Sequence, residues 1–239
     1  MIKNIFKYFL LLIFAMQFVS CDENEKQLFD SNFSGIYFYT RPAFDAEGNP
    51  GDSIDLNFQY LEDAIKNLEQ QVYVTMAGDA KDYDRTFKLV VDAEETTALE
   101  GVHYQKLEDT YTFGKGLFYT SIPVPILRAE DLKENSYDLV LNLTSTEDFE
   151  LGLGERLSFK IKVSDNLLEA PKFWTRLIGF RAGLYHPIKC KKFIEIAGVD
   201  GPNWSPVSDA ELDIFIKQTR KWFEENPTYD ENGNRLYFQ

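Results

Sequence analysis

Leu157-Ser158-Phe159-Lys160-Ile161-Lys162-Val163 places an apolar residue at every second position and a polar residue at each position between. Successive side chains of a strand point to opposite faces, so this period of two predicts a strand with one buried face and one face in water. The same alternation recurs in segments 36–39, 54–60, 72–76, 87–91, 122–126 and 137–143. About eight such strands, separated by turn residues, predict a mainly β chain folded as an antiparallel immunoglobulin-like sandwich.

Two local signals predict how strands of this sandwich are placed. Gly78-Asp79 follows segment 72–76, and a turn of this composition predicts a hairpin with the next strand. Pro123 and Pro125 alternate with apolar residues in their own segment. Because proline donates no backbone hydrogen bond, that segment is expected at the edge of a sheet.

The spacing of apolar residues changes from two toward 3.6 after the last strand. Pro171, Pro187 and Ser208 each precede apolar residues at helical spacing, which predicts three helices. Three short helices bury too little surface to be stable alone. We therefore expect a sandwich domain over residues 35–165 and a smaller α-rich C-terminal lobe, residues 166–239, packed on it.

The first residues have the pattern of an exported lipoprotein. Lys3 and Lys7 precede an uncharged apolar run that ends at Val19, and Ser20-Cys21 follows. The run is shorter than the roughly 20 apolar residues of a membrane-spanning helix. We expect residues 1–20 to be a cleaved signal peptide and Cys21 to be lipidated, so that acyl chains attach the mature protein to a membrane.

Residues 21–34 are polar and acidic, and this composition predicts a solvated tether. Asp22, Glu23 and Glu25 directly follow the cysteine. They resemble the surface-export signal of Bacteroidetes lipoproteins. This resemblance implies an outer-membrane location with the protein facing the cell exterior, in preference to retention in the periplasm.

The charge of the chain excludes one class of partner. The sequence has 25 Lys and Arg against 39 Asp and Glu. Removal of residues 1–20 leaves 23 basic residues, so the mature chain carries a net charge of about −16. Nucleic acid needs a basic surface, and the basic residues here are scattered. With 44% hydrophobic residues, the chain is nevertheless able to build a sizeable core.

Candidate catalytic and metal-binding groups are few. His186 lies four residues before Cys190, but no oxyanion-hole motif accompanies them, so a buried structural cysteine is the favoured interpretation. Asp230, Asn232 and Asn234 have calcium-loop spacing, but the glycine that such a loop requires is missing at the next position, and a hairpin turn is favoured. We therefore expect no catalytic residue, no metal and no cofactor.

Aromatic residues are the candidate partner or ligand contacts. Trp204 lies in a loop of Asp, Gly, Pro, Asn and Ser residues, where a large apolar side chain either anchors the loop or meets a partner. Loop anchoring is the favoured interpretation. Tyr37 and Tyr39 share one face of their strand, and this face is expected to meet solvent or a partner.

Several segments resemble Calx-beta domains. They are Thr97-Ala98-Leu99-Glu100-Gly101-Val102-His103-Tyr104, Tyr111-Thr112-Phe113-Gly114-Lys115-Gly116, Ile122-Pro123-Val124-Pro125-Ile126 and the closing strand Phe159–Asn166. The resemblance covers about residues 68–166 and implies an immunoglobulin-like sandwich. Some Calx-beta domains bind calcium through acidic loops. In this chain His103 stands where that pattern typically has an acid, so a turn or strand-start role is favoured for His103 over a metal ligand.

The whole chain also resembles a Bacteroidetes lipoprotein family of unknown function, whose members tend to be encoded beside SusC/SusD-type importers. The segments concerned are Thr97-Ala98 with Gly101 and Tyr104, Trp174, Gly183-Leu184-Tyr185, Lys189 and Tyr229–Gly233. This resemblance, the lipidation signal at Cys21 with its acidic tether and the missing catalytic motifs together predict a non-enzymatic accessory subunit of such an importer, for capture of a glycan or peptide ligand or for assembly. The alternative is an adhesin or structural spacer at the cell surface, and an enzyme ranks third.

Overall fold

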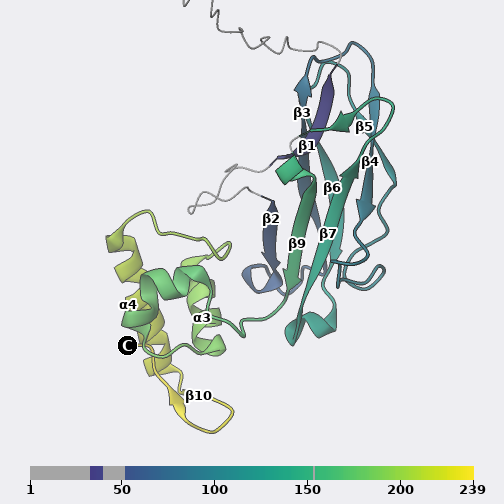
Figure 1. Ribbon diagram of the computed structural model, residues 1–239. Coiled ribbons are helices and arrows are strands. Elements are labelled where there is room, and N and C mark those ends of the chain that lie inside the picture. Colours follow the sequence, from purple (N-terminus) through teal and green to yellow (C-terminus); the bar gives the residue numbers. More distant parts are fainter. Residues whose placement is uncertain (1–32, 40–51, 153) are drawn as a thin grey trace, which may run out of the picture.

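The computed structural model describes residues 33–39, 52–152 and 154–239. Cys21, the signal peptide and residues 22–32 of the tether lie outside the described residues. Two layers of strands form an elongated sandwich, and the helices form a smaller lobe beside one end of it (Figure 1). The predicted fold class, a mainly β immunoglobulin-like sandwich with a helical C-terminal lobe, is confirmed.

The sandwich consists of two sheets. The four-stranded sheet has the order β6 (Tyr119–Leu127), β3 (Asn67–Gly78), β1 (Ser34–Tyr39), β8 (Glu150–Leu151). The five-stranded sheet has the order β2 (Ser53–Asn57), β9 (Ser158–Ser164), β7 (Ser136–Thr144), β4 (Arg85–Val91), β5 (Thr110–Phe113). Alternate residues of both sheets point inward and form one core, as the period of two predicts. Short 3₁₀ helices connect the strands: η2 (Phe58–Tyr60), η3 (Glu130–Lys133) and η4 (Gly154–Arg156).

The hairpin predicted at Gly78-Asp79 is wrong. Strand β3 pairs with β1 and β6, while β4 pairs with β5 and β7, so the chain crosses from one sheet to the other after Gly78. Gly78 has φ 112°, and a Cβ there would lie 2.0 Å from the Phe33 carbonyl oxygen. Because Gly78 has no side chain, its backbone can lie this close to the start of the first strand.

The edges of the sandwich differ in part from the sequence expectation. Strand β1 pairs with β8 in parallel and β2 pairs with β9 in parallel, so both sheets are mixed at one edge and antiparallel elsewhere. Strand β6 is an edge strand, as its prolines predict. Its inward residues Ile122, Val124 and Ile126 are fully buried.

The helical lobe contains a π-helical turn (Trp174–Ile178), α2 (Gly179–Ala182), α3 (Pro187–Ala197), α4 (Asp209–Glu225) and the hairpin β10 (Thr228–Tyr229) with β11 (Arg235–Leu236). Ser208 caps α4, because its hydroxyl accepts a hydrogen bond from the Glu211 backbone N–H at 3.3 Å. The lobe has its own aromatic core, which includes Phe173, Trp174 and Phe193. Within the described ranges, no helix has both the length and the apolarity to cross a membrane.

Candidate functional site

A cleft of about 590 Å³ lies where the sandwich meets the segment that leads to the helical lobe. Its floor is the outer face of three neighbouring strands, and it consists of Asp55, Asn57, Ser136, Lys162 and Ser164. Its walls are residues 134–135, residues 166–172 and the loop residues Pro202 and Asn203. Small-molecule sites in proteins have volumes of roughly 300–1,000 Å³, so the cleft has the size of a ligand site.

Strand register brings the polar floor together. Asp55 of β2 is level with Lys162 of β9, and Lys162 is level with Asp138 of β7. Two residues away on each strand, the next outward row consists of Asn57, Ser164 and Ser136. Because alternate residues of these strands fill the core, the residues between them all point outward to the same face.

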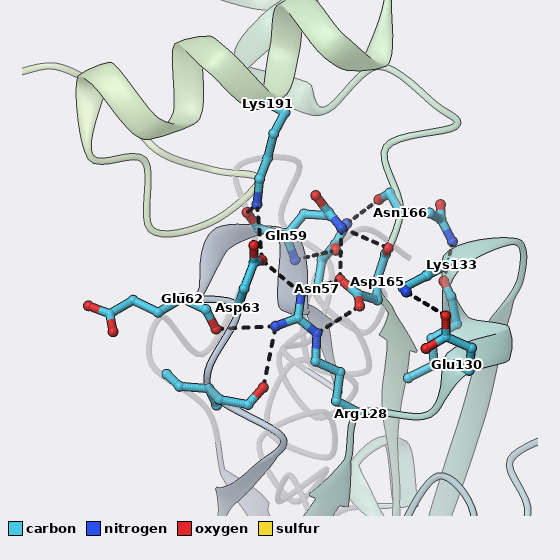
Figure 2. Close-up of polar contacts among 12 residues, drawn as sticks. Asn57, Gln59, Glu62, Asp63, Arg128, Glu130, Lys133, Asp165, Asn166 and Lys191 are labelled. Atoms are coloured by element: carbon cyan, nitrogen blue, oxygen red, sulfur yellow. Dashed lines mark hydrogen bonds and ion pairs between the residues drawn. The ribbon is translucent and has the colours of Figure 1, made fainter.

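A buried ion pair lies beside the cleft, directly before the lining residue Asn166 (Figure 2). Arg128 Nε lies 2.7 Å from Asp165 Oδ2, and Arg128 Nη2 lies 2.8 Å from Asp165 Oδ1. Arg128 Nη1 also donates to the Glu62 and Ile65 carbonyl oxygens. The Arg128 and Asp165 side chains are 7% and 2% exposed. This bidentate geometry holds the start of the lobe segment against the sandwich.

Amide side chains extend this network across the junction (Figure 2). Asn57 Nδ2 donates to the Asn166 carbonyl at 2.7 Å, and Gln59 Nε2 donates to Asp165 Oδ1 at 2.8 Å. Asn166 Nδ2 donates to the Leu132 carbonyl at 2.7 Å. From the lobe, Lys191 Nζ donates to the Gln59 carbonyl at 3.2 Å. These bonds join β2, η2 and η3 to the lobe, so they fix the spacing between the floor and the walls of the cleft.

Several charged groups that line the cleft are not part of this network. Within the described chain, no hydrogen bond or ion pair engages the side chains of Asp55, Lys162 and Lys172. The surrounding protein partly excludes water from Asp55 and raises the pKa of its carboxyl, and the two lysines oppose that rise. Burial likewise raises the pKa of Tyr60, which also lines the cleft. The cleft therefore offers donors and acceptors that remain available to a ligand.

The structure places Trp204 against the aromatic core of the lobe. Its ring meets the rings of Phe173 and Phe193 edge to face, with centroid distances of 6.0 and 5.9 Å. The side chain remains half-buried, and Pro202 and Asn203 of the same loop line the cleft. This position matches loop anchoring, and partner contact by Trp204 itself stays a prediction.

Tyr37 and Tyr39 lie on the outer face of the four-stranded sheet, away from the cleft, and both are half-buried. Strand register places Tyr39 beside Tyr73, and it places Thr75 between Tyr37 and Tyr119. Tyr73 and Tyr119 are 45% and 65% exposed. The two predicted tyrosines thus belong to a wider surface, the tyrosine face, which consists of Tyr37, Tyr39, Tyr73 and Tyr119.

Cys190, His186 and His103, which the sequence singles out, each have structural contacts in the fold. Cys190 is fully buried, and burial raises the pKa of its thiol to about 12. His186 caps α3, because its Nδ1 accepts a hydrogen bond from the Ile188 N–H at 3.2 Å. His103 lies in a turn, as expected; its Nδ1 accepts from the Leu99 N–H and its Nε2 lies 3.1 Å from Asp131 Oδ1.

The calcium-like spacing near the C-terminus forms a turn. Asp230 accepts hydrogen bonds from the backbone N–H groups of Asn232 and Asn234, at 2.9 and 2.7 Å, and from the Asn234 amide. The hairpin predicted there is confirmed. No group of three or more His, Cys, Asp or Glu side chains in the described ranges is arranged to hold a metal ion.

The described residues thus form an immunoglobulin-like sandwich, a helical lobe and a polar cleft where the two meet. The chain belongs to the family described as Domain of unknown function (DUF4843), which matches residues 31–199. That match includes the sandwich, the junction and α3. No curated protein matches the chain.

Solved structures with a similar fold include the apo form of the Calx CBD1 domain, at 15% identity over 56% of this chain and 97% of that one, with a TM-score of 0.40. The calcium-binding domain CBD12 of CALX1.1 is similar at 14% identity over 54% of this chain and 44% of its own, with a TM-score of 0.39. A putative carbohydrate-binding protein from Bacteroides ovatus is similar at 16% identity over 56% of this chain and 37% of its own, with a TM-score of 0.35. The chain thus spans less than half the length of the last two proteins.

Proposed function

We propose that this protein is a surface lipoprotein that captures a soluble nutrient ligand in the junction cleft. The observation that carries the proposal is a cleft of ligand size whose lining includes charged side chains that make no hydrogen bond or ion pair in the described chain. The side chains of Asp55, Lys162 and Lys172 are exposed to solvent, so a ligand can reach them without breaking an existing contact. Available polar groups gathered in a concave site favour a binding role.

The importer context is the second component of the proposal. Cys21 and the acidic residues after it support a lipid anchor at the outer membrane, facing the cell exterior. The likeness to lipoproteins encoded beside SusC/SusD-type importers supports a role as an accessory subunit of such an importer. In this role the protein binds the ligand and performs no chemistry on it.

Co-purification from outer membranes tests the importer role. Tagged full-length protein, extracted in mild detergent, should bring down a SusC/SusD-type pair in amounts close to its own. The matched control is Cys21→Ala protein, which lacks the lipid acceptor and should recover neither importer protein. Recovery of the wild-type protein alone would overturn the importer role, and it would leave ligand capture to be judged by binding measurements.

The tyrosine face is the observation that favours the alternative function, an adhesin. Tyr37, Tyr39, Tyr73 and Tyr119 lie on one outward face of β1, β3 and β6, and exposed aromatic residues are frequent in protein interfaces. An adhesin requires this face for attachment. Tyr73→Ala together with Tyr119→Ala should then abolish attachment of cells to a surface, whereas ligand capture in the cleft should be unaffected.

A further inference from the structure

We propose that the ligand of the junction cleft is a short uncharged oligosaccharide, held through Asp55. This inference rests on the proposed capture function and names its ligand class. It follows from four features of the cleft: its charge balance, its available hydrogen-bonding groups, its small apolar surfaces and its rigidity.

The charges of the cleft nearly cancel. The charged lining residues are Asp55, Glu134, Glu169, Lys162 and Lys172, which are three carboxylates and two ammonium groups. A polyanion would need a clear excess of positive charge, and a polycation would need a clear excess of negative charge. The cleft provides neither, although the chain as a whole is strongly acidic. An uncharged polar ligand fits this balance best.

The available groups suit hydroxyl groups. A carboxylate accepts hydrogen bonds at two oxygens, and an ammonium group donates three. Asp55 stands level with Lys162 on the floor, and Lys172 acts on the Asp55 carboxyl from the lobe segment. A hydroxyl group is both a donor and an acceptor, so neighbouring hydroxyls of one sugar can donate to Asp55 and accept from the lysines.

Apolar surface is present in small pieces. Leu168, Pro171 and Pro202 line the walls, and Leu168 is 63% exposed. Tyr60 also lines the cleft, and its ring is held edge to face against Phe173 at a centroid distance of 6.5 Å. Such surfaces suit the C–H faces of sugar rings, because aromatic rings attract polarised C–H groups and small apolar contacts exclude water. They are too fragmented for a lipid chain.

The junction network makes the site rigid in advance of binding. Asn57 and Asn166 line the cleft, and the Asn57 side-chain amide donates a hydrogen bond to the Asn166 backbone carbonyl at 2.7 Å. The ion pair between Arg128 and Asp165 holds the residue directly before Asn166 against the sandwich. A preorganised site loses little entropy on binding, which matters for a ligand whose individual hydrogen bonds are weak against water.

The test is isothermal titration of the purified mature domain with three probe panels. They are neutral hexasaccharides (maltohexaose, xylohexaose, cellohexaose and mannohexaose), oligogalacturonate of matched length, and uncharged hexapeptides. We expect saturable binding of at least one neutral hexasaccharide and none of the oligogalacturonate or peptides. Asp55→Asn should weaken that binding about 10-fold or more, the usual effect of losing a charged hydrogen bond, with an unchanged melting temperature.

Asp138→Asn is the matched control. Asp138 flanks Lys162 on the side opposite Asp55 and is paired with Lys160 at 3.6 Å, but it does not line the cleft. Its substitution should leave oligosaccharide binding unchanged. Equal losses in both variants would overturn the role of Asp55.

The remaining outcomes separate the ligand class from the capture function. Binding of oligogalacturonate or peptide alone, lost in Asp55→Asn, would overturn the neutral-oligosaccharide inference and keep capture by the cleft. Binding of a neutral hexasaccharide that Asp55→Asn leaves intact would move the site elsewhere on the protein and overturn the inference. No binding of any panel would overturn both the ligand class and the capture function.

Discussion

Arg128 and Asp165 form a bidentate ion pair between the ends of two strands that belong to different sheets, β6 and β9. Arg128 directly follows β6, Asp165 directly follows β9, and the Arg128 guanidinium also lies 5.4 Å from the centre of the Phe58 ring. The pair therefore ties the two layers of the sandwich together at the point where the chain leaves for the helical lobe.

Removal of one partner of this pair should destabilise the protein strongly. Asp165→Asn leaves the buried guanidinium with only the exposed Asp63 carboxylate, 3.5 Å from Arg128 Nη2, as counter-charge. Loss of a buried ion-pair partner typically costs about 3–5 kcal/mol of unfolding free energy. Urea denaturation followed by circular dichroism measures the loss. The control is Lys133→Met in the exposed pair Lys133–Glu130, where a change of no more than about 1 kcal/mol is expected. Similar small losses in both variants would show that the buried pair does not hold the junction.

Replacement of Trp204 should reduce stability, because its ring packs on Phe173 and Phe193 in the core of the lobe. We expect Trp204→Ala to cost about 3 kcal/mol of unfolding free energy, at the low end for large aromatic residues because the ring is half-buried. Tyr237→Ala, at a residue that is 58% exposed, is the control and should change stability little.

The contrary outcome for Trp204 is equally specific. Unchanged stability together with a loss of at least 2 kcal/mol in ligand or importer association, on the order of 30-fold in affinity, would identify Trp204 as a contact residue. One denaturation curve and one titration separate the two roles.

The thiol of Cys190 should be inert in the folded protein. Burial raises its pKa from an ordinary value near 9 to about 12, so the reactive thiolate is absent at neutral pH. In Cys21→Ser protein, Ellman's reagent should label Cys190 only after addition of denaturant. Rapid labelling of the folded protein would contradict the buried position.

The same pKa shift predicts how stability depends on pH. The unfolded thiol loses its proton near pH 9, whereas the folded thiol keeps it up to about pH 12. The contribution of Cys190 to stability is therefore fully present below pH 9 and is lost as the pH rises toward 12. Cys190→Ser protein should lack this part of the alkaline stability loss. Identical profiles of unfolding free energy against pH for the wild-type and Cys190→Ser proteins would contradict this prediction.

Lipid attachment should depend on Cys21 alone. Cys21→Ala should leave an uncleaved or soluble precursor, because only the cysteine thiol accepts the diacylglyceryl group. Incorporation of radiolabelled palmitate in cells measures this directly, with Cys190→Ala as the control that keeps its label. Protease treatment of intact cells tests surface display separately. If the protein is protected until the outer membrane is broken, it does not face the exterior.

The short strands β5 and β8 have too few residues to show a period, but most other strands and the longer helices were predictable because each depends on local periodicity. The partners of the strands were not. The alternation in β3 and β4 is the same whether they pair with each other or lie in opposite sheets, so it does not show that the chain crosses over after Gly78. The parallel partners of β1 and β2 were likewise invisible, because the sequence does not indicate which sheet receives each of these two strands.

The cleft was missed for a different physical reason. Asp55, Lys162 and Lys172 come from separate parts of the chain, and each is an ordinary polar residue in its own segment. Only the register of β2 with β9 brings the first two together. Arg128 and Asp165 show no special spacing in the sequence, so the network that positions the lobe also became visible only in the fold.

Hydrogen exchange of the purified protein, with and without the tightest-binding neutral hexasaccharide, tests the central claim most directly. We predict slower exchange in residues 53–60, 162–172 and 201–204, the segments that form the floor and walls of the cleft, and no change in β1, β3 or β6. Slower exchange confined to the tyrosine face of β1, β3 and β6, or no change anywhere in the protein, would contradict capture by the junction cleft.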